Sequence, residues 1–342
     1  MRKILIITLI ALFGIKTNAT IVYLNNSTTT NNSQRIYRTF AEAYNKCSNG
    51  DTIYVIGSNN HYGAIGISKP ITIIGPGYFL DKNHETQVNK KEAVFDDISF
   101  LEGSEGSTIK GISNSRGTGS ELNIYTSNIT VENCFIIWFI AIKRGDDANI
   151  SNITIKKCYF KSSSYASIRN NNGYDGIWSN INISNNIIHN GIEAPDGSTG
   201  IINGNLIDDN FDIGESSTFE IHNNILLATS SKNISMPLLP NASITHNLSV
   251  IDYFGTDNGN IAGVSASNLF LGSTGTSTDG QYQLGKSSDA LGAGKNGIDA
   301  GPFGGNDPYR LSGLPNLPNI YELSTGGFVS GDEMKVRLKI KQ

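Results

Sequence analysis

Six residues, Ile181-Asn182-Ile183-Ser184-Asn185-Asn186, decide the fold, because the chain repeats this phrase in varied form. In each copy, β-branched residues alternate with polar ones and a polar pair follows. The central apolar residues of the copies, 19 to 28 residues apart, are Val131, Ile155, Ile183, Ile202, Ile221 and Ile244. One strand in each period of about 20 residues is the signature of a solenoid, whose coils bury their apolar faces against one another.

Asn residues that close four of these phrases occupy the same position in successive coils. They are Asn186, Asn205, Asn224 and Asn247. Asn tolerates the left-handed backbone conformation that a sharp turn requires. Stacked Asn amides can also hydrogen-bond to one another as a ladder. Both interpretations give these residues a structural role.

Two cysteines, Cys134 and Cys158, stand at the corresponding place in two earlier phrases. Residues stacked in neighbouring coils lie about 4.8 Å apart. A disulfide is geometrically possible at that distance. The alternative, which we favour, is that both are small buried apolar residues with free thiols.

The N-terminus has the three parts of a secretory signal peptide. Basic residues in Met1-Arg-Lys3 precede the apolar run 4–15, and Thr17-Asn-Ala19 supplies small residues for cleavage after Ala19. The run is too short to span a bilayer. We therefore expect a secreted or cell-surface protein with no transmembrane segment in the mature chain.

The charge of the mature chain argues against a nucleic-acid partner. The formal net charge of the full sequence is −4, and loss of Arg2, Lys3 and Lys16 with the leader makes it −7. Proteins that bind nucleic acid usually present a basic surface to the phosphates.

One helix is predicted near the mature N-terminus. Thr39 and Glu42 have the spacing of a capping box, and Gly50 is a suitable residue to end the helix. An apolar stripe at helical spacing is formed by Phe40, Ala43, Tyr44 and Cys47. We expect this helix to cover the open end of the solenoid, where unpaired strand edges would otherwise invite aggregation.

The pattern divides the chain into four parts. Residues 1–19 form the signal peptide, 20–60 the first strand and capping helix, and 61–270 the coils. Residues 271–342 form a loop-rich C-terminal cap and tail, in which Met334–Ile340 alternates as a last strand. The fold class predicted is all-β: a right-handed parallel β-helix solenoid with an N-terminal capping helix and an irregular C-terminal cap.

Several stretches resemble a known superfamily. They run from Thr39-Phe-Ala-Glu-Ala through Gly50-Asp-Thr-Ile-Tyr-Val and on to Lys69-Pro-Ile-Thr-Ile-Ile-Gly75, with Gly297-Ile-Asp-Ala-Gly-Pro-Phe-Gly-Gly305 near the end. The chain is similar here to exported bacterial proteins of the pectate-lyase-like superfamily of right-handed parallel β-helices. The resemblance implies the fold and leaves the activity open, because the superfamily includes lyases, hydrolases, esterases, tail spikes and adhesins.

The chain lacks most of the motifs that the hydrolases of this superfamily carry. Polygalacturonase-like members have Asn-Thr-Asp, Gly-Asp-Asp, Gly-His-Gly and Arg-Ile-Lys in order, and only Gly145-Asp146-Asp147 is present. Inverting hydrolysis needs an acid and a base on opposite sides of the sugar. If the protein is an enzyme, the resemblance therefore favours a polysaccharide lyase over a glycoside hydrolase.

Lyases of the superfamily hold Ca²⁺ with acidic residues and use Arg or Lys as the base. The catalytic candidates that this resemblance suggests are Asp146, Asp147, Lys143 and Arg144. Adjacent strand residues point to opposite sides, so these four cannot all serve if the segment is extended. Candidate Ca²⁺ ligands are Asp208, Asp209 and Asp212. The alternative is that the aspartates are polar turn residues.

Aromatic and basic residues gather between positions 138 and 178, where the spacing between phrases is longest. Loops on one rim of a solenoid commonly form its binding face, aromatic rings stack on sugars, and cations bind carboxylate or sulfate. The predicted substrate-binding residues are Trp138, Arg169, Tyr174, Asp175 and Trp178. The alternative is that half of the aromatic residues face the core.

Three functions remain open from the sequence. The first is a polysaccharide-contacting protein of the cell surface with no assigned catalysis. The second is a Ca²⁺-dependent lyase acting on uronates, and the third is a structural or adhesive scaffold. An acidic cluster and an Arg or Lys on one outward face would favour the lyase.

Overall fold

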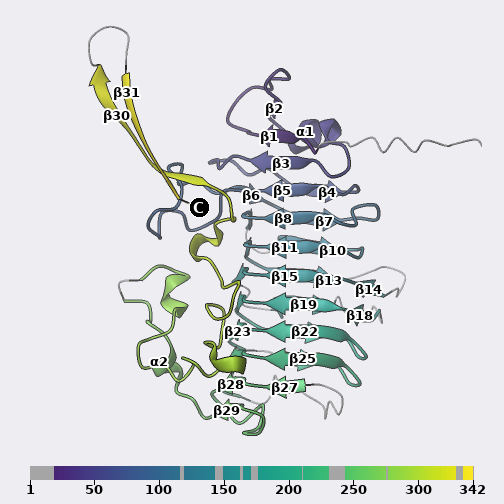
Figure 1. Cartoon of the computed structure of the whole chain (residues 1–342). Helices are drawn as coiled ribbons and strands as arrows, with labels where there is room; N and C mark the ends of the chain where they lie inside the picture. The colour runs from purple at the N-terminus through teal and green to yellow at the C-terminus, as the bar shows by residue number, and fades with distance from the viewer. Residues whose placement is uncertain are drawn as a thin grey trace, which may run out of the picture.

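A computed structural model gives the fold and describes residues 19–115, 119–142, 149–161, 165–170, 176–209, 211–230, 243–274, 276–328 and 334–341. The chain winds into stacked coils whose strands form three parallel sheets along the stack (Figure 1). This is a parallel β-helix solenoid, as the repeats predict. Within these residues no helix is long and apolar enough to cross a membrane.

The longest sheet, sheet A, carries the repeated phrases. In spatial order its strands are β2 (Ile36–Tyr37), β1 (Ile21–Leu24), β3 (Thr52–Val55), β5 (Thr72–Ile74), β8 (Thr108–Lys110), β11 (Thr130–Glu132), β15 (Thr154–Lys156), β19 (Ile181–Ser184), β22 (Thr199–Asn203), β25 (Thr218–His222) and β27 (Ser243–Thr245). Each pair is parallel and in register, so that Val131 lies opposite Ile155 and Ile155 opposite Ile183.

Sheet B and sheet C complete each coil. In chain order, sheet B contains β4 (Ile65–Ile67), β7 (Ile98–Phe100), β10 (Glu121–Ile124), β13 (Phe139–Ile142), β17 (Ile168–Asn170), β21 (Ile192–Ala194) and β24 (Phe211–Ile213). Sheet C contains β6 (Val94–Phe95), β9 (Ser113–Asn114), β12 (Phe135–Ile136), β16 (Tyr159–Phe160), β20 (Ile187–Ile188), β23 (Leu206–Ile207), β26 (Ile225–Leu226), β28 (Leu248–Ser249) and β29 (Ile261–Ala262). A typical coil therefore runs from sheet A to sheet C to sheet B.

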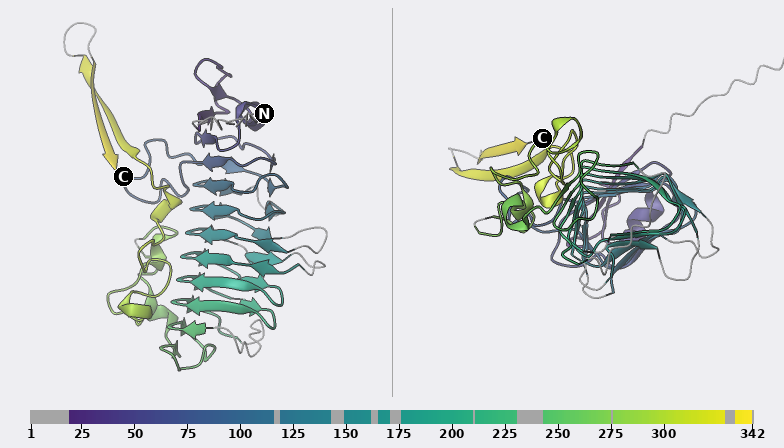
Figure 2. Two further views of the ribbon diagram at one scale, coloured as in Figure 1. Left: turned by 45° about the vertical axis from the view of Figure 1, so that its right-hand side comes forward. Right: turned by 90° about the horizontal axis from the view of Figure 1, so that it is seen from below.

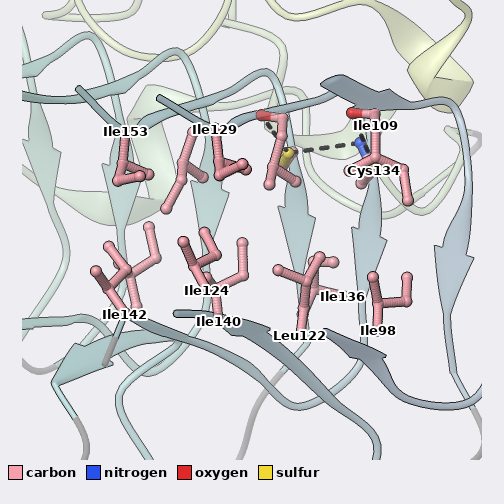
Figure 3. Packing of buried hydrophobic residues seen from close by; sticks show 14 of the residues in the cluster. Ile98, Ile109, Leu122, Ile124, Ile129, Cys134, Ile136, Ile140, Ile142 and Ile153 are labelled. Carbon is pink, nitrogen blue, oxygen red and sulfur yellow. Dashed lines mark hydrogen bonds between the residues drawn. The ribbon is translucent and has the colours of Figure 1, made fainter. Parts of the chain in front are cut away.

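The interior of the solenoid consists of apolar side chains stacked from coil to coil. Ile109, Val131 and Ile155 from sheet A and Leu122 and Ile140 from sheet B are completely buried. Figure 3 shows rows of isoleucines from the two sheets facing each other across the interior. Burying each such side chain contributes about 1.5–3 kcal/mol of hydrophobic free energy, which makes this stacking the main source of stability.

The Asn ladder is confirmed at the turn between sheets A and C. Asn186 Nδ2 donates to Asn205 Oδ1 at 2.9 Å, Asn205 Nδ2 to Asn224 Oδ1 at 2.9 Å, and Asn224 Nδ2 to Asn247 Oδ1 at 2.9 Å. All four Asn residues are completely buried. The left-handed backbone lies one residue earlier, as at Asn185 and Asn223. The two suggested roles of Asn are thus divided between neighbouring positions.

The cysteines extend the same column at the N-terminal end of the ladder. The backbone N–H of Cys158 donates to Asn186 Oδ1, and that of Cys134 points to the sulfur of Cys158 at 3.5 Å. Both thiols are free and buried. Burial raises the pKa of the Cys158 thiol well above its ordinary value, with a further contribution from Cys134.

Helix α1 (Phe40–Lys46) lies at the N-terminal end of the stack, beside β1 and β2 (Figure 1). The capping box is confirmed, because the Glu42 N–H donates to Thr39 Oγ1 and the Thr39 N–H donates to Glu42 Oε2. Phe40 packs edge-on against Phe95 of the first coils at 6.4 Å between ring centroids. The helix therefore joins the same core as the coils.

Residues 264–318, which we call the C-terminal segment, run back along the outside of the stack. Figure 2 shows this segment beside the coils, outside their outline when seen along the axis. It buries a second apolar cluster against the outer face of sheet C. This cluster is formed by Tyr78, Phe135, Tyr159, Ile187, Leu206, Ile225 and Leu248 with Val264, Leu269, Ala290, Ala300 and Tyr309. Sheet C is thus covered on both faces.

The chain ends in a hairpin that projects from the solenoid (Figure 1). Its strands, β30 (Asn319–Phe328) and β31 (Met334–Lys341), pair in an antiparallel manner. The last strand predicted at Met334–Ile340 is therefore confirmed. One face of the hairpin exposes large apolar side chains, namely Ile320, Leu323, Val336, Leu338 and Ile340.

Candidate functional site

The outer face of sheet B concentrates charge in its last three coils. Arg169 of β17, Glu193 of β21 and Asp212 of β24 lie opposite one another in register. Their neighbours on each strand, such as Ile168 and Ile192, are completely buried. Because strand residues alternate in direction, the three charged side chains point outward, about 4.8 Å apart from coil to coil.

Aromatic rings from the turns between sheets C and B adjoin this charged column. Tyr165 is 47% exposed, and its ring stacks on Trp138 with 6.0 Å between centroids and 23° between planes. Phe139 meets the Tyr165 ring edge-on at 5.9 Å. Tyr165 is therefore an exposed ring held in place by two others, as a sugar-stacking platform requires.

Arg169 connects the rings to the carboxylates. Its guanidinium carbon lies 4.9 Å from the centroid of Tyr165 and 5.4 Å from that of Phe139. Its Nε is 3.7 Å from Glu193 Oε2. The residue is only 7% exposed, so the guanidinium is a fixed, partly neutralised cation. Stacking and ion pairing both favour Arg over Lys at such a place.

Asp212, the last residue of the charged column, is partly buried. Burial raises the pKa of its carboxyl group, and the nearby charge of Asp196 raises it further. Beside it, the hydroxyl of Tyr253 donates to the backbone oxygen of Phe211 at 3.0 Å. Burial, and then the charge of Asp212, raise the pKa of Tyr253, which stays neutral. We call Trp138, Tyr165, Arg169, Glu193 and Asp212 the lateral strip.

A histidine and an aspartate lie at the same turns, next to the lateral strip. His189 Nδ1 bonds Asp208 Oδ2, and the backbone N–H of Asn190 donates to Asp208 Oδ1 at 2.8 Å. His189 Nε2 lies 3.2 Å from the hydroxyls of both Tyr159 and Tyr282. Burial raises the pKa of each tyrosine. Tyr282 belongs to the C-terminal segment, so this cluster fastens that segment to the coils.

The structure brings together some of the predicted site residues and separates others. Trp138 and Arg169 both contact Tyr165, and Asp212 lies two coils from Arg169 along the lateral strip. Trp178 is only 1% exposed and packs in the core, so it offers no surface for a ligand. Asp208 is hydrogen-bonded to His189. The other candidates, Lys143, Arg144, Asp146, Asp147, Tyr174 and Asp175, lie outside the described residues.

Glu193 was not predicted, although the sequence holds a signal for it. Ile192-Glu193-Ala194 aligns with Ile168-Arg169-Asn170, so the coil period places Glu193 beside Arg169. Metal binding has less support. In the part of the chain that the structure describes, no group of three or more His, Cys, Asp or Glu side chains is arranged to hold a metal ion. Asp208, Asp209 and Asp212 accordingly form no such group.

These features define the class of the protein: a parallel β-helix with an aromatic and charged lateral face. No model of a known protein family matches the sequence. No curated protein is significantly similar to it either. The chemistry of the lateral strip therefore has to carry the functional argument.

Proposed function

We propose that this chain is a secreted or cell-surface protein that binds acidic polysaccharide through the lateral strip. The observation that carries the proposal is the Tyr165 ring, which is 47% exposed and is held by Trp138 and Arg169. A pyranose can stack on the ring through its C–H face. The positive charge of Arg169 beside the ring can then attract a uronate carboxylate or a sulfate of the same polymer.

The proposal also explains why the rings and charges lie on consecutive coils. A linear polysaccharide repeats along its length, and the strip offers contacts repeated along the solenoid axis. Glu193 and Asp212 can accept hydrogen bonds from sugar hydroxyls. The signal-peptide pattern at residues 1–19 is consistent with an extracellular ligand.

The test compares Tyr165→Ala with Tyr23→Ala in affinity electrophoresis through gels that contain polygalacturonate, alginate or chondroitin sulfate. Tyr23 is a matched control, because it is an exposed tyrosine on sheet A, away from the lateral strip. We expect Tyr165→Ala to weaken binding by about tenfold or more, the range found for aromatic contacts. Equal retention of the two variants and the wild type would refute the proposal.

A Ca²⁺-dependent lyase is the second candidate, favoured by one observation. An arginine and two carboxylates share one outward column of sheet B. In β-elimination a base removes the proton beside the uronate carboxylate, and the glycosidic oxygen leaves. The ultraviolet absorbance of the unsaturated product, followed with and without Ca²⁺, tests this activity. A rise that needs Ca²⁺ and is lost in Arg169→Gln would assign a lyase; a flat trace would leave a binding protein.

A further inference from the structure

A second surface of the solenoid forms a polar groove on a different sheet. The groove, with a volume of about 420 Å³, lies where the outer face of sheet A meets residues 298–307 of the C-terminal segment. Its volume is within the range of small-molecule sites, roughly 300–1,000 Å³. Its floor faces away from sheet B, so a ligand here would not touch the lateral strip.

Two outward columns of sheet A make the floor. The first contains Asn182, Ile201 and Glu220, and the second contains Ser184, Asn203 and His222. The strands β19, β22 and β25 hold these six side chains in register, about 4.8 Å apart from coil to coil. A floor made by paired strands is rigid, so its polar groups are already in position before a ligand arrives.

The wall of the groove is fastened to the coils by specific bonds. Asn185 Nδ2 donates to the backbone oxygens of Pro302 at 3.1 Å and Gly304 at 3.0 Å. Lys156 Nζ donates to Asp307 Oδ2 at 3.0 Å, and Lys157 also bonds Asp307. Gly304 and Gly305 leave the wall without side chains that would fill the groove.

Within the described part of the chain, most polar side chains of the floor have no hydrogen-bonding partner. Among the described residues, no hydrogen bond or ion pair is found for the side chains of Asn182, Ser184, Glu220 and His222. The side chain of Asn203 accepts one hydrogen bond from a described residue, from Asn223 Nδ2 to its Oδ1 at 2.9 Å. These groups therefore present donors and acceptors to whatever enters the groove. Ile201, which is 38% exposed, adds an apolar contact between them.

The charge of the groove selects the kind of ligand. Glu220 and Asp299 are acidic, while the cations Lys156 and Lys157 are already paired with Asp307 and Glu132. Burial, followed by the charge of Lys295, lowers the pKa of His222, so its ring is neutral at neutral pH. The amides, the hydroxyl, the carboxylates and the aliphatic side chain match the hydroxyls and C–H faces of an uncharged sugar. The six floor residues include no arginine or lysine that would attract a uronate or a sulfate, whereas the lateral strip contains Arg169.

We propose that this groove is a binding site for a neutral oligosaccharide. It is separate from the lateral strip in position and in ligand chemistry, and it does not depend on the acidic-polysaccharide proposal. The protein would then hold a neutral and an acidic glycan at once, on two faces of one solenoid.

The test measures binding of cellohexaose, xylohexaose and mannohexaose to the full chain by titration calorimetry and saturation-transfer NMR. We expect at least one neutral hexasaccharide to bind, and we expect Asn182→Ala/Glu220→Ala to weaken it by about tenfold or more. The control is Thr108→Ala/Thr130→Ala, which changes the same outward column of sheet A two or more coils away from Asn182, at residues that do not line the groove. Thermal unfolding of both variants shows whether each remains folded.

Two outcomes would overturn the proposal. One is the absence of binding by all three neutral hexasaccharides, and the other is equal affinity in the wild type and the groove variant. Tyr165→Ala separates the two proposals, because it should weaken acidic polymers and leave the neutral hexasaccharide unchanged. If Tyr165→Ala abolished neutral binding instead, the sugar would be bound at the lateral strip and the groove assignment would be wrong.

Discussion

Asn205 shows how one side chain can hold three coils together. Its Oδ1 accepts from the backbone N–H of Asn186 at 3.0 Å and from Asn186 Nδ2 at 2.9 Å. Its Nδ2 donates to the backbone oxygen of Ile183 and to Asn224 Oδ1, each at 2.9 Å. A buried turn has no water to satisfy these groups, so the amide replaces the bonds that the backbone cannot make.

Replacing Asn205 with Ala should therefore cost roughly 2–4 kcal/mol of unfolding free energy, because buried polar groups lose their partners and a small cavity opens. Urea unfolding measures the change. Asn182→Ala is the matched control, since Asn182 lies outside on sheet A and should change stability by less than about 0.5 kcal/mol. Similar losses for the two variants would contradict a special role of the ladder.

At the scale of the element, the C-terminal segment is held partly by an ion pair that titrates. Burial tends to raise the pKa of Asp307, but hydrogen bonds from Lys157 and Lys156 outweigh it, and the pKa lies below its ordinary value of 3.8. A lowered carboxyl pKa contributes stability that is present above pH 3.8 and is lost as the pH falls through the folded-state value.

We therefore expect the C-terminal segment to loosen as the pH falls from about 4 downward, before the coils unfold. Hydrogen exchange of residues 298–307, compared with that of β19 and β22, measures the difference. Asp307→Asn should show the faster exchange already at neutral pH and should lose the pH dependence. Because Asp307 is mostly exposed, we expect a local effect with little change in global stability. If residues 298–307 exchanged at the same rate in Asp307→Asn and in the wild type, the ion pair would not be what holds the segment.

The sequence predicts the elements whose own pattern defines them, such as the sheet A strands, helix α1, the Asn ladder and the strand at Met334–Ile340. Trp178 shows why the site is harder. An aromatic residue can pack in the core or form an exposed surface for a ligand, and the sequence pattern is the same in both cases. The pairing of β14 (Ile150–Ser151) with β18 (Trp178–Ser179) places Trp178 in the core. The outward residues of sheet C, such as Tyr159 and Leu206, are buried because a segment about 100 residues further along the chain covers them. Local periodicity carries no information about such distant contacts.

At the scale of the whole molecule, the hairpin of β30 and β31 is joined at its base to residues 85–88. The backbone N–H of Val88 donates to the backbone oxygen of Ile320, and Asn319 Nδ2 donates to that of Thr86. Lys341 forms an ion pair with Glu85. Two-stranded hairpins are marginally stable by themselves in water, and this one exposes an apolar face.

Deleting residues 320–342 should therefore leave the melting temperature of the solenoid within a few degrees, about the shift that loss of 1 kcal/mol causes. The shortened protein should also associate less at high concentration, because an exposed apolar face is removed. Calorimetry and light scattering measure the two effects. Deletion of 264–342 is the comparison, and it should cause aggregation because it uncovers the outer face of sheet C. A large loss of stability in the shorter deletion would show that the hairpin is part of the folded core.

The path of the C-terminal segment has a consequence for how this protein can change over evolution. The segment meets the coils in reverse order: Gly301 bonds Asn223, Gly304 bonds Asn185, Asp307 bonds Lys157, and Leu314 bonds Asn133. Most solenoids lengthen or shorten by whole repeats, since each repeat contacts only its neighbours. Here the C-terminal segment is attached to several successive coils along its length, so its own length has to match the number of coils. Inserting or losing one coil would shift every later attachment by about 4.8 Å. The number of coils should thus stay constant during evolution. A duplicated coil would have to be accompanied by a longer C-terminal segment.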